Sequence, residues 1–71
     1  EEDTLAHYIL RRRLQACMRD LKRPDYLQRT ITDIAFSWGF NNGAHFSRAF
    51  RDHTGMSPSD FRAAALRSLP D

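Results

Sequence analysis

The sequence has little of what cross-links or interrupts a small fold, with one cysteine, three glycines and three prolines. The lone Cys17 excludes an internal disulfide and a cysteine-based zinc finger. No apolar run approaches the roughly 18 residues of a membrane span, and the acidic start Glu1-Glu2-Asp3 is unlike a signal peptide. The chain also lacks an initial methionine, so we expect it to be a piece of a longer protein.

The composition is that of one small folded domain with a basic body. A mass of 8.3 kDa excludes a multidomain enzyme. Between Thr4 and Pro70, eleven basic residues stand against five acidic ones, a net charge of +6, and ten of the eleven are arginines. Because the arginine fork suits phosphates and base edges, this charge permits nucleic-acid binding without establishing it.

Apolar side chains recur at helical spacing in four stretches, and no stretch alternates with the period of a strand. The four stretches are Leu5–Lys22, Ile31–Trp38, a third from Asn41 or Asn42 to Thr54, and a fourth that follows Ser57. We therefore predict an all-α fold, in which a long helix precedes a helix-turn-helix and a closing helix, giving a homeodomain-like three-helix core.

Capping residues mark most of the predicted helix ends. Thr4, Thr30 (with Asp33 in a capping box), and Ser57 before Pro58 are predicted to start helices, and Gly39 and Gly55 to stop them. Pro24 should end the first helix. A short polar loop is expected from there to Arg29, and a frayed tail over residues 68–71.

Two short helices joined by a glycine-containing turn fit a helix-turn-helix, whose second helix enters the major groove of DNA. The candidate DNA contacts are Asn42, Gly43, Ala44, His45, Ser47, Arg48 and Arg51. Arg48 can bond guanine through two hydrogen bonds, and Ala44 can touch a thymine methyl. Asn42 can read adenine or cap the helix. The alternative for each polar or charged side chain is a solvated surface.

The remaining chemical groups favour structural roles. The aromatic residues Trp38, Phe40, Phe46, Phe50 and Phe61 are predicted to be core rather than a stacking platform. The run Arg11-Arg12-Arg13 is either a solvated helix face or a phosphate clamp. His7, His45 and His53 lack metal-ligand spacing, and Cys17 occupies an apolar position as a small hydrophobe. We predict no metal, no cofactor and no enzymatic activity.

A longer ordered pattern covers most of the chain. It comprises Tyr8-Ile9, Arg13-Leu14, Cys17, Ile31-Thr32-Asp33-Ile34-Ala35, Trp38-Gly39-Phe40, His45-Phe46-Ser47-Arg48-Ala49-Phe50-Arg51, Gly55-Met56-Ser57-Pro58 and Phe61-Arg62. This pattern resembles the C-terminal half of the DNA-binding region of AraC/XylS-type transcription regulators, which holds two helix-turn-helix modules joined by a long helix.

The resemblance implies a division of the chain and a set of partners. Residues 1–29 would be the linker helix and its loop, and residues 30–71 the second module, with a recognition helix at about 42–54. A first helix-turn-helix and an effector-sensing domain would belong to the parent protein. Double-stranded DNA is the implied partner and RNA polymerase a further one, with no membrane partner and a cytoplasmic location at the nucleoid.

The chain departs from the family pattern in a few places. Gly43 and Ala44 stand where the family often has polar side chains, which shifts base reading towards Asn42, His45 and Arg48. Phe61 replaces a usual tyrosine. Cys17 also stands where the family has a small residue, and the loop Lys22–Arg29 is somewhat longer than usual.

A second function remains open from the sequence alone, namely a protein-interaction module. Leu5, Tyr8, Ile9 and Leu10 are apolar and lie at the start of the long helix. We expect part of this patch to be exposed or to fill a partner contact, an expectation that burial of all four side chains within the same chain would refute.

Overall fold

The computed structural model describes residues 4–68, which form helices and no strand. The elements are α1 (Leu5–Leu21), the short 3₁₀ helix η1 (Pro24–Tyr26), α2 (Ile31–Ser37), α3 (Gly43–Thr54) and α4 (Pro58–Arg67). The predicted all-α fold is confirmed. The first two helices end one residue earlier than predicted, because Lys22 and Trp38 are the C-caps of α1 and α2.

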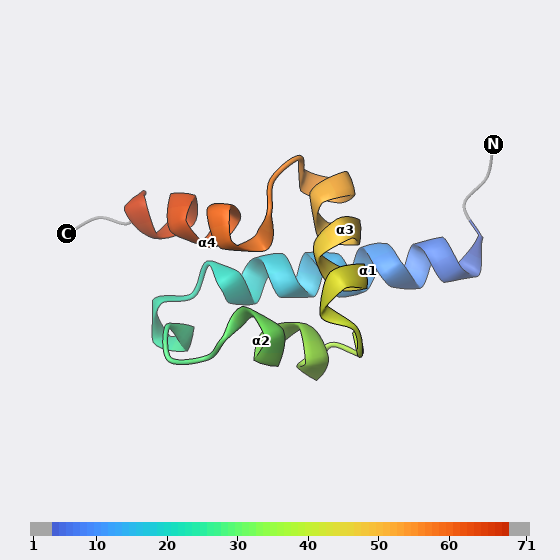
Figure 1. Ribbon diagram of the computed structural model, residues 1–71, viewed down its shortest axis with the longest axis horizontal. Helices are drawn as coiled ribbons and strands as arrows, with labels where there is room; N and C mark the ends of the chain where they lie inside the picture. Colours follow the sequence, from blue (N-terminus) through green and yellow to red (C-terminus); the bar gives the residue numbers. More distant parts are fainter. Residues whose placement is uncertain (1–3, 69–71) are drawn as a thin grey trace.

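The helices are arranged around α1, the longest helix, which lies through the middle of the molecule (Figure 1). α3 crosses in front of α1, while α2 and α4 lie on either side, and α1 contacts all three. The three predicted N-caps, Thr4, Thr30 and Ser57, each accept a hydrogen bond from the amide three residues later. Asn42, for which capping was one of two predicted roles, does the same. Within residues 4–68, no helix has the length and apolar character to cross a membrane.

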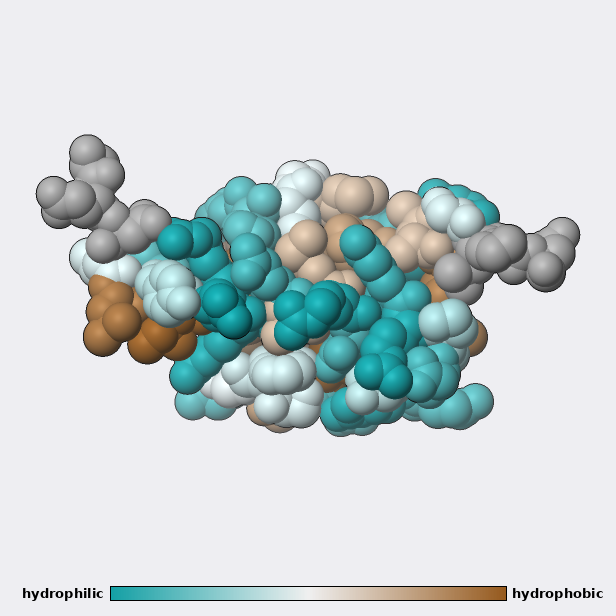
Figure 2. Space-filling model, turned by 180° about the vertical axis from the view of Figure 1, so that it is seen from behind, coloured by the Kyte–Doolittle hydropathy of each residue, from teal (hydrophilic) through white to brown (hydrophobic). Residues whose placement is uncertain are grey.

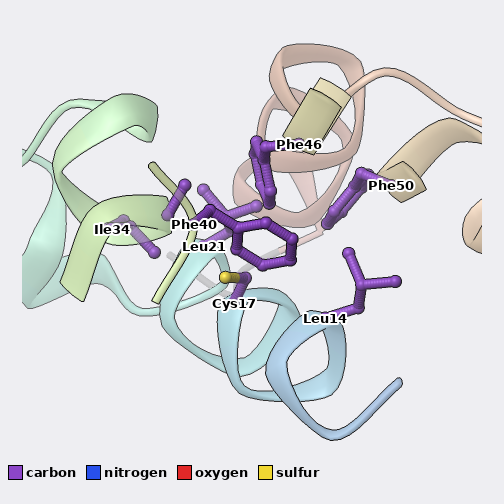
Figure 3. Packing of buried hydrophobic residues seen from close by; sticks show 8 residues of the cluster. Leu14, Cys17, Leu21, Ile34, Phe40, Phe46 and Phe50 are labelled. Atoms are coloured by element: carbon purple, nitrogen blue, oxygen red, sulfur yellow. The ribbon is translucent and has the colours of Figure 1, made fainter. Parts of the chain in front are cut away.

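The core forms where α1, α2 and α3 meet (Figure 3). Its buried members are Leu14, Cys17, Leu21, Ile34, Ala35, Phe40, Phe46 and Phe50. An aromatic series runs through it, because Phe46 lies 4.9 Å from Phe40 and 5.6 Å from Phe50 between ring centroids. Phe50 then meets the half-buried Phe61 of α4 at 5.3 Å. Edge contacts of this kind add to the burial of apolar area, and they fix α3 between the turn and α4.

The prediction that Trp38 belongs to the core is wrong. Its side chain is 39% exposed. Its indole Nε1 donates a hydrogen bond of 2.8 Å to the carboxylate of Asp20, which is nearly buried in α1. This hydrogen bond satisfies the polar edge of the indole and joins the end of α2 to α1. The ring itself stays partly exposed.

The segment after α1 is more ordered than the predicted polar loop. Tyr26 is half-buried against the core, and the guanidinium groups of Arg23 and Arg29 lie 4.2 and 5.2 Å from its ring. Its carbonyl accepts a hydrogen bond of 2.6 Å from Nη2 of Arg62 in α4. The segment after α1 therefore packs against the core and is hydrogen-bonded to α4.

Two predictions concern the ends of the chain. Ser68 is the C-cap of α4, and its hydroxyl donates to the carbonyl of Ala64 at 3.1 Å. It is therefore part of the helix end rather than a frayed tail. The rest of the predicted tail, residues 69–71, and the acidic residues 1–3 lie outside the described residues.

Candidate nucleic-acid interface

The turn between α2 and α3 positions the candidate recognition helix. Gly39 has a φ of 101°, a conformation that favours glycine, and it reverses the chain after Trp38. The Phe40 amide then donates to the Ala35 carbonyl at 3.1 Å, which closes the turn over α2. Asn42 starts α3 as its N-cap, and Gly55, with a φ of 84°, ends it.

α3 has one buried face and one exposed face. Phe46 and Phe50 point into the core, and Ala49 packs partly against it. All seven predicted DNA-contacting residues are exposed: Asn42, Gly43, Ala44, His45, Ser47, Arg48 and Arg51. Within a helix, Ala44, Arg48 and Arg51 are spaced to share one face, so the structure brings these predicted side chains together on the outside of α3.

Two shallow grooves run along the flanks of this exposed face. The α3–α4 groove, about 490 Å³, is lined by Ile31, Ala44, Ser47, Arg48, Arg51, Ser57, Pro58 and Ser59. The α1–α3 groove, about 430 Å³, is lined by His7, Leu10, Arg11, Leu14, His45, Arg48, Ala49, Asp52 and His53. Arg48 borders both grooves, so it occupies the ridge between them.

The exposed face of α3 carries two arginines, Arg48 and Arg51, with Asp52 on the side towards α1. Within the described residues, neither Arg48 nor Arg51 pairs with a carboxylate, in contrast to Arg23, which bonds Asp25 at 2.7 Å. The N-terminus of α4 borders the α3–α4 groove and brings the positive end of a helix dipole beside Arg51. Such a surface attracts phosphates, and its unpaired guanidinium groups are available to bind them.

The start of α3 limits which base contacts are available. Asn42 Oδ1 accepts the His45 amide at 2.9 Å, so the capping interpretation of Asn42 is confirmed. Its side-chain NH₂ group is the remaining donor for a base acceptor. Gly43 has no atom within 4 Å of where a side chain would begin, and it presents only backbone. The His45 ring lies beside Phe40, with 6.2 Å between centroids.

The three arginines of the run on α1 lie in different surroundings. Arg11 borders the α1–α3 groove, and Arg12 lies over the ring of Tyr8 at 6.0 Å. The guanidinium of Arg13 lies against Gly39, where an added Cβ would approach its Cζ to 3.0 Å. The three side chains thus point to three different neighbours, and Arg13 lies against the turn that precedes α3.

Two residues missing from the predicted interface, Asp52 and His53, line the α1–α3 groove. Ser57, Pro58 and Ser59 form a wall of the α3–α4 groove. The start of α4 was recognised from its cap, but its position beside α3 depends on tertiary packing. The Arg62 bond to Tyr26 has no local signal, because the two residues are 36 positions apart.

Cys17 and the three histidines are the residues that could act as a nucleophile or as metal ligands. Burial, with a smaller contribution from the charge of Asp20, raises the pKa of Cys17 to about 12, so the thiol stays protonated and is a core side chain rather than a nucleophile. Among residues 4–68, no three histidine, cysteine or acidic side chains gather as metal ligands. The α1–α3 groove holds His7, His45 and His53 among its lining residues.

Comparison with known proteins agrees with this geometry. Residues 2–64 match a helix-turn-helix domain family of the AraC type. The chain is 37% identical over 68 residues to the "Probable transcription factor PqrA" of Proteus vulgaris, covering 96% of this chain and 52% of that protein. It is also 37% identical over 65 residues to the "Transcriptional activator RhrA" of Rhizobium meliloti, covering 92% of this chain and 20% of that protein.

A third relative is an uncharacterized helix-turn-helix transcriptional regulator of Staphylococcus aureus, SACOL0084, which is 36% identical over 56 residues, or 79% of this chain and 7% of that protein. The chain therefore spans about half or less of the curated relatives it matches. No solved structure matches it. The family match and the relatives agree with the fold: the chain belongs to the AraC/XylS-type helix-turn-helix transcription regulators and is a DNA-binding part of such a protein.

Proposed function

We propose that α3 enters the major groove of duplex DNA and selects the sequence there. Arg48, on the ridge between the two grooves, contacts a base edge, with His45 beside it and the Asn42 NH₂ group at the start of the helix. Gly43 and Ala44 let the backbone approach the bases closely. The observation that carries this proposal is the exposed face of α3, whose two arginines have no carboxylate partner within residues 4–68.

Ser47 and Arg51 bind the phosphate backbone in this arrangement. Both line the α3–α4 groove together with Ser57 and Ser59 at the start of α4. Backbone contacts fix the register of a helix on the duplex, and base contacts select the sequence. Arg51 therefore contributes affinity to every duplex, whereas Arg48 contributes discrimination between duplexes.

We also propose that residues 1–29 and 30–71 act as the linker helix and the second module of a longer regulator. The support is an N-terminal apolar patch, Leu5, Tyr8 and Ile9, that stays exposed on α1, whereas Leu10 packs partly against the core. Figure 2 shows hydrophobic surface at that end of the molecule. The patch would pack against a first helix-turn-helix in the parent protein.

The cellular location and RNA polymerase as a second partner are inferred only from the class of protein. A regulator that binds chromosomal DNA works in the cytoplasm at the nucleoid, and we propose that location. RNA polymerase stays a prediction, because no described residue singles it out.

The proposal is tested with a duplex enriched from a random pool by the protein. Fluorescence anisotropy is measured for the selected duplex and for a scrambled one, at several salt concentrations. Arg48→Ala should cost about 1–3 kcal/mol on the selected duplex and much less on the scrambled one. Arg51→Ala should weaken both equally and reduce the salt slope by about one.

Arg67→Ala is the matched control, because Arg67 is an exposed arginine in the last turn of α4, away from α3. It should leave both affinities nearly unchanged. Equal effects of Arg48→Ala and Arg67→Ala on the selected duplex would contradict the assignment of Arg48 to a base edge.

A further inference from the structure

The α1–α3 groove gathers all three histidines of the chain. His7 lines it from α1, and His45 and His53 line it from α3. The three side chains are exposed. Histidine is the side chain whose charge ordinarily changes between about pH 5 and pH 8, so the charge of this groove depends on pH within that range.

The other charged groups of the groove keep their charge over the same range. Arg11 and Arg48 stand against Asp52, a net charge of +1, and protonation of the three histidines would raise it to +4. Arg13 lines the adjoining hollow between α1 and the turn before α3 and adds a further positive charge nearby. No residue of α4 lines the groove. Acidification therefore makes a weakly positive surface strongly positive.

The two grooves on the flanks of α3 correspond to the two strands of a duplex. The major groove of DNA is bounded by one phosphate backbone on each side, and Arg48 occupies the ridge between the α3–α4 and α1–α3 grooves. A helix that places Arg48 on the bases brings one backbone towards each groove. The α3–α4 groove, with Ser47 and Arg51, takes the first backbone, so the α1–α3 groove lies beside the second.

His7 lies on a different side of α1 from the N-terminal apolar patch. It precedes Leu10 by three residues and Leu14 by seven, spacings that place the three side chains on one side of a helix. That side meets α3. None of the three patch residues lines the α1–α3 groove, and His53 belongs to α3. A first helix-turn-helix packed on the patch would therefore leave this groove open to the duplex.

We infer that the α1–α3 groove binds the phosphate backbone of the second DNA strand through the protonated imidazoles of His7 and His53, so that duplex binding tightens as the pH falls. The inference rests on the proposed entry of α3 into the major groove. An imidazolium donates from both ring nitrogens, and such charge-assisted hydrogen bonds to phosphate are strong. Because backbone contacts carry no sequence information, the gain applies to every duplex.

The experiment measures fluorescence anisotropy of the selected and the scrambled duplex at about pH 5.5 and about pH 7.5, on either side of the ordinary histidine range and at constant ionic strength. The 71-residue protein should bind both duplexes roughly tenfold more tightly at the lower pH. Two additional phosphate contacts should also steepen the salt slope there by about two. An affinity that is equal at the two pH values would overturn the inference.

Two variants remove or fix the charge of the histidines. His7→Gln with His53→Gln should reduce the gain to below about threefold on both duplexes, whereas a gain that stays roughly tenfold would overturn the inference. His7→Arg with His53→Arg carries the charge permanently. It should bind both duplexes at the higher pH about as tightly as the unmodified chain does at the lower pH, a result that a damaged fold could not produce.

Gln15→His is the matched control. Gln15 is an exposed residue of α1 that lines neither groove beside α3, so a histidine there adds a titrating group without a backbone contact. It should leave the gain at roughly tenfold. Circular dichroism at both pH values checks that each variant is folded.

The inference and the proposed function fail in different measurements. Arg48→Ala tests the base contact through the difference between the selected and the scrambled duplex, whereas the pH gain is expected to be the same for both. If Arg48→Ala abolishes that difference but the glutamine variant keeps the full pH gain, the contact with the second backbone alone is refuted.

Discussion

The two halves of α1 have the same type of sequence and opposite surroundings. In the second half, Leu14, Cys17 and Leu21 are buried, with at most 2% of their surface exposed. In the first half, Leu5 is 73%, Tyr8 49% and Ile9 39% exposed. Both halves carry apolar side chains at helical spacing, but the core buries the second half and reaches only Leu10 of the first.

The difference shows that apolar residues at helical spacing predict which face of a helix is apolar. They do not predict whether other helices of the same chain cover that face. The second half of α1 packs against α3 through Phe46 and Phe50, whereas the first half extends beyond the point where α3 crosses it. Apolar residues that stay exposed together in this way mark an interaction surface more often than an error of folding. The changes below test whether the stability of the domain resides in the second half alone.

The largest effect is expected at Leu14. Leu14→Ala removes a fully buried side chain between α1 and α3, which should lower the free energy of unfolding by about 2–5 kcal/mol. Chemical denaturation followed by circular dichroism measures this. A loss below about 1 kcal/mol would show that α1 is loosely packed even where it appears enclosed.

The next effect is expected at the link between α1 and α2. Trp38→Phe keeps an aromatic ring but leaves the Asp20 carboxylate without its donor, at a cost of about 1–3 kcal/mol. The double change with Asp20→Asn should cost less than the sum of the single changes, because one interaction is removed twice. Additive costs would mean that the hydrogen bond contributes nothing to stability.

Between pH 8 and pH 10, a smaller effect on the free energy of unfolding should appear through Cys17. Burial raises the pKa of the thiol from 9.0 to about 12 in the folded chain, so the folded state holds its proton where the unfolded state has lost it. This contribution to stability is complete below a pH of 9.0 and is lost as the pH rises from there to about 12, at about 1.4 kcal/mol per pH unit.

Cys17→Ala lacks this contribution, so comparison of the two unfolding curves between pH 8 and pH 10 separates the thiol from the tyrosines. The stability of the unmodified chain should fall more steeply than that of the variant. Parallel curves would refute the burial of a protonated thiol in the second half of α1.

The smallest effect is expected at Leu5. Leu5→Lys changes a side chain that is mostly in solvent, so the free energy of unfolding should move by less than about 0.5 kcal/mol. The same denaturation experiment measures it. A loss comparable to that of Leu14→Ala would erase the distinction between the two halves.

Local chemistry was sufficient to predict the helices. Thr4, Thr30 and Ser57 each occupy the N-cap expected of them, and Gly39 and Gly55 adopt the positive φ expected at a stop. Caps and turns depend on neighbours within four residues, so a single sequence contains their whole signal. The predicted capping box at Thr30 is only half formed within residues 4–68. The Asp33 amide donates to the Thr30 hydroxyl, but the Asp33 side chain forms no hydrogen bond back to Thr30.

Contacts between distant residues were beyond prediction. The aromatic character of Trp38 indicated a core position, but its N–H found Asp20, 18 residues earlier, and stayed at the surface. Similarly, the polar composition of residues 23–29 gave no sign that Tyr26 would pack against the core and bond Arg62. In both cases a polar atom decided the position, and its partner lies on another element.

The candidate interface was predicted as one helix face but not as a surface. Spacing along α3 indicated that Ala44, Arg48 and Arg51 point outwards, as they do. The walls beside them come from the starts of α2 and α4 and from α1. Their contribution depends on how the helices pack, and no pattern within a single helix contains that information.

Because α1 is one continuous helix from Leu5 to Leu21, its buried turns also set the direction in which its exposed turns face. The buried turns pack against α3, and the exposed turns continue the same helix. One residue inserted between Leu10 and Leu14 would rotate the leading turns by about 100° and advance them by about 1.5 Å. A module bound to those turns would then have a different orientation relative to the duplex, although the buried contacts of Leu14, Cys17 and Leu21 would be kept.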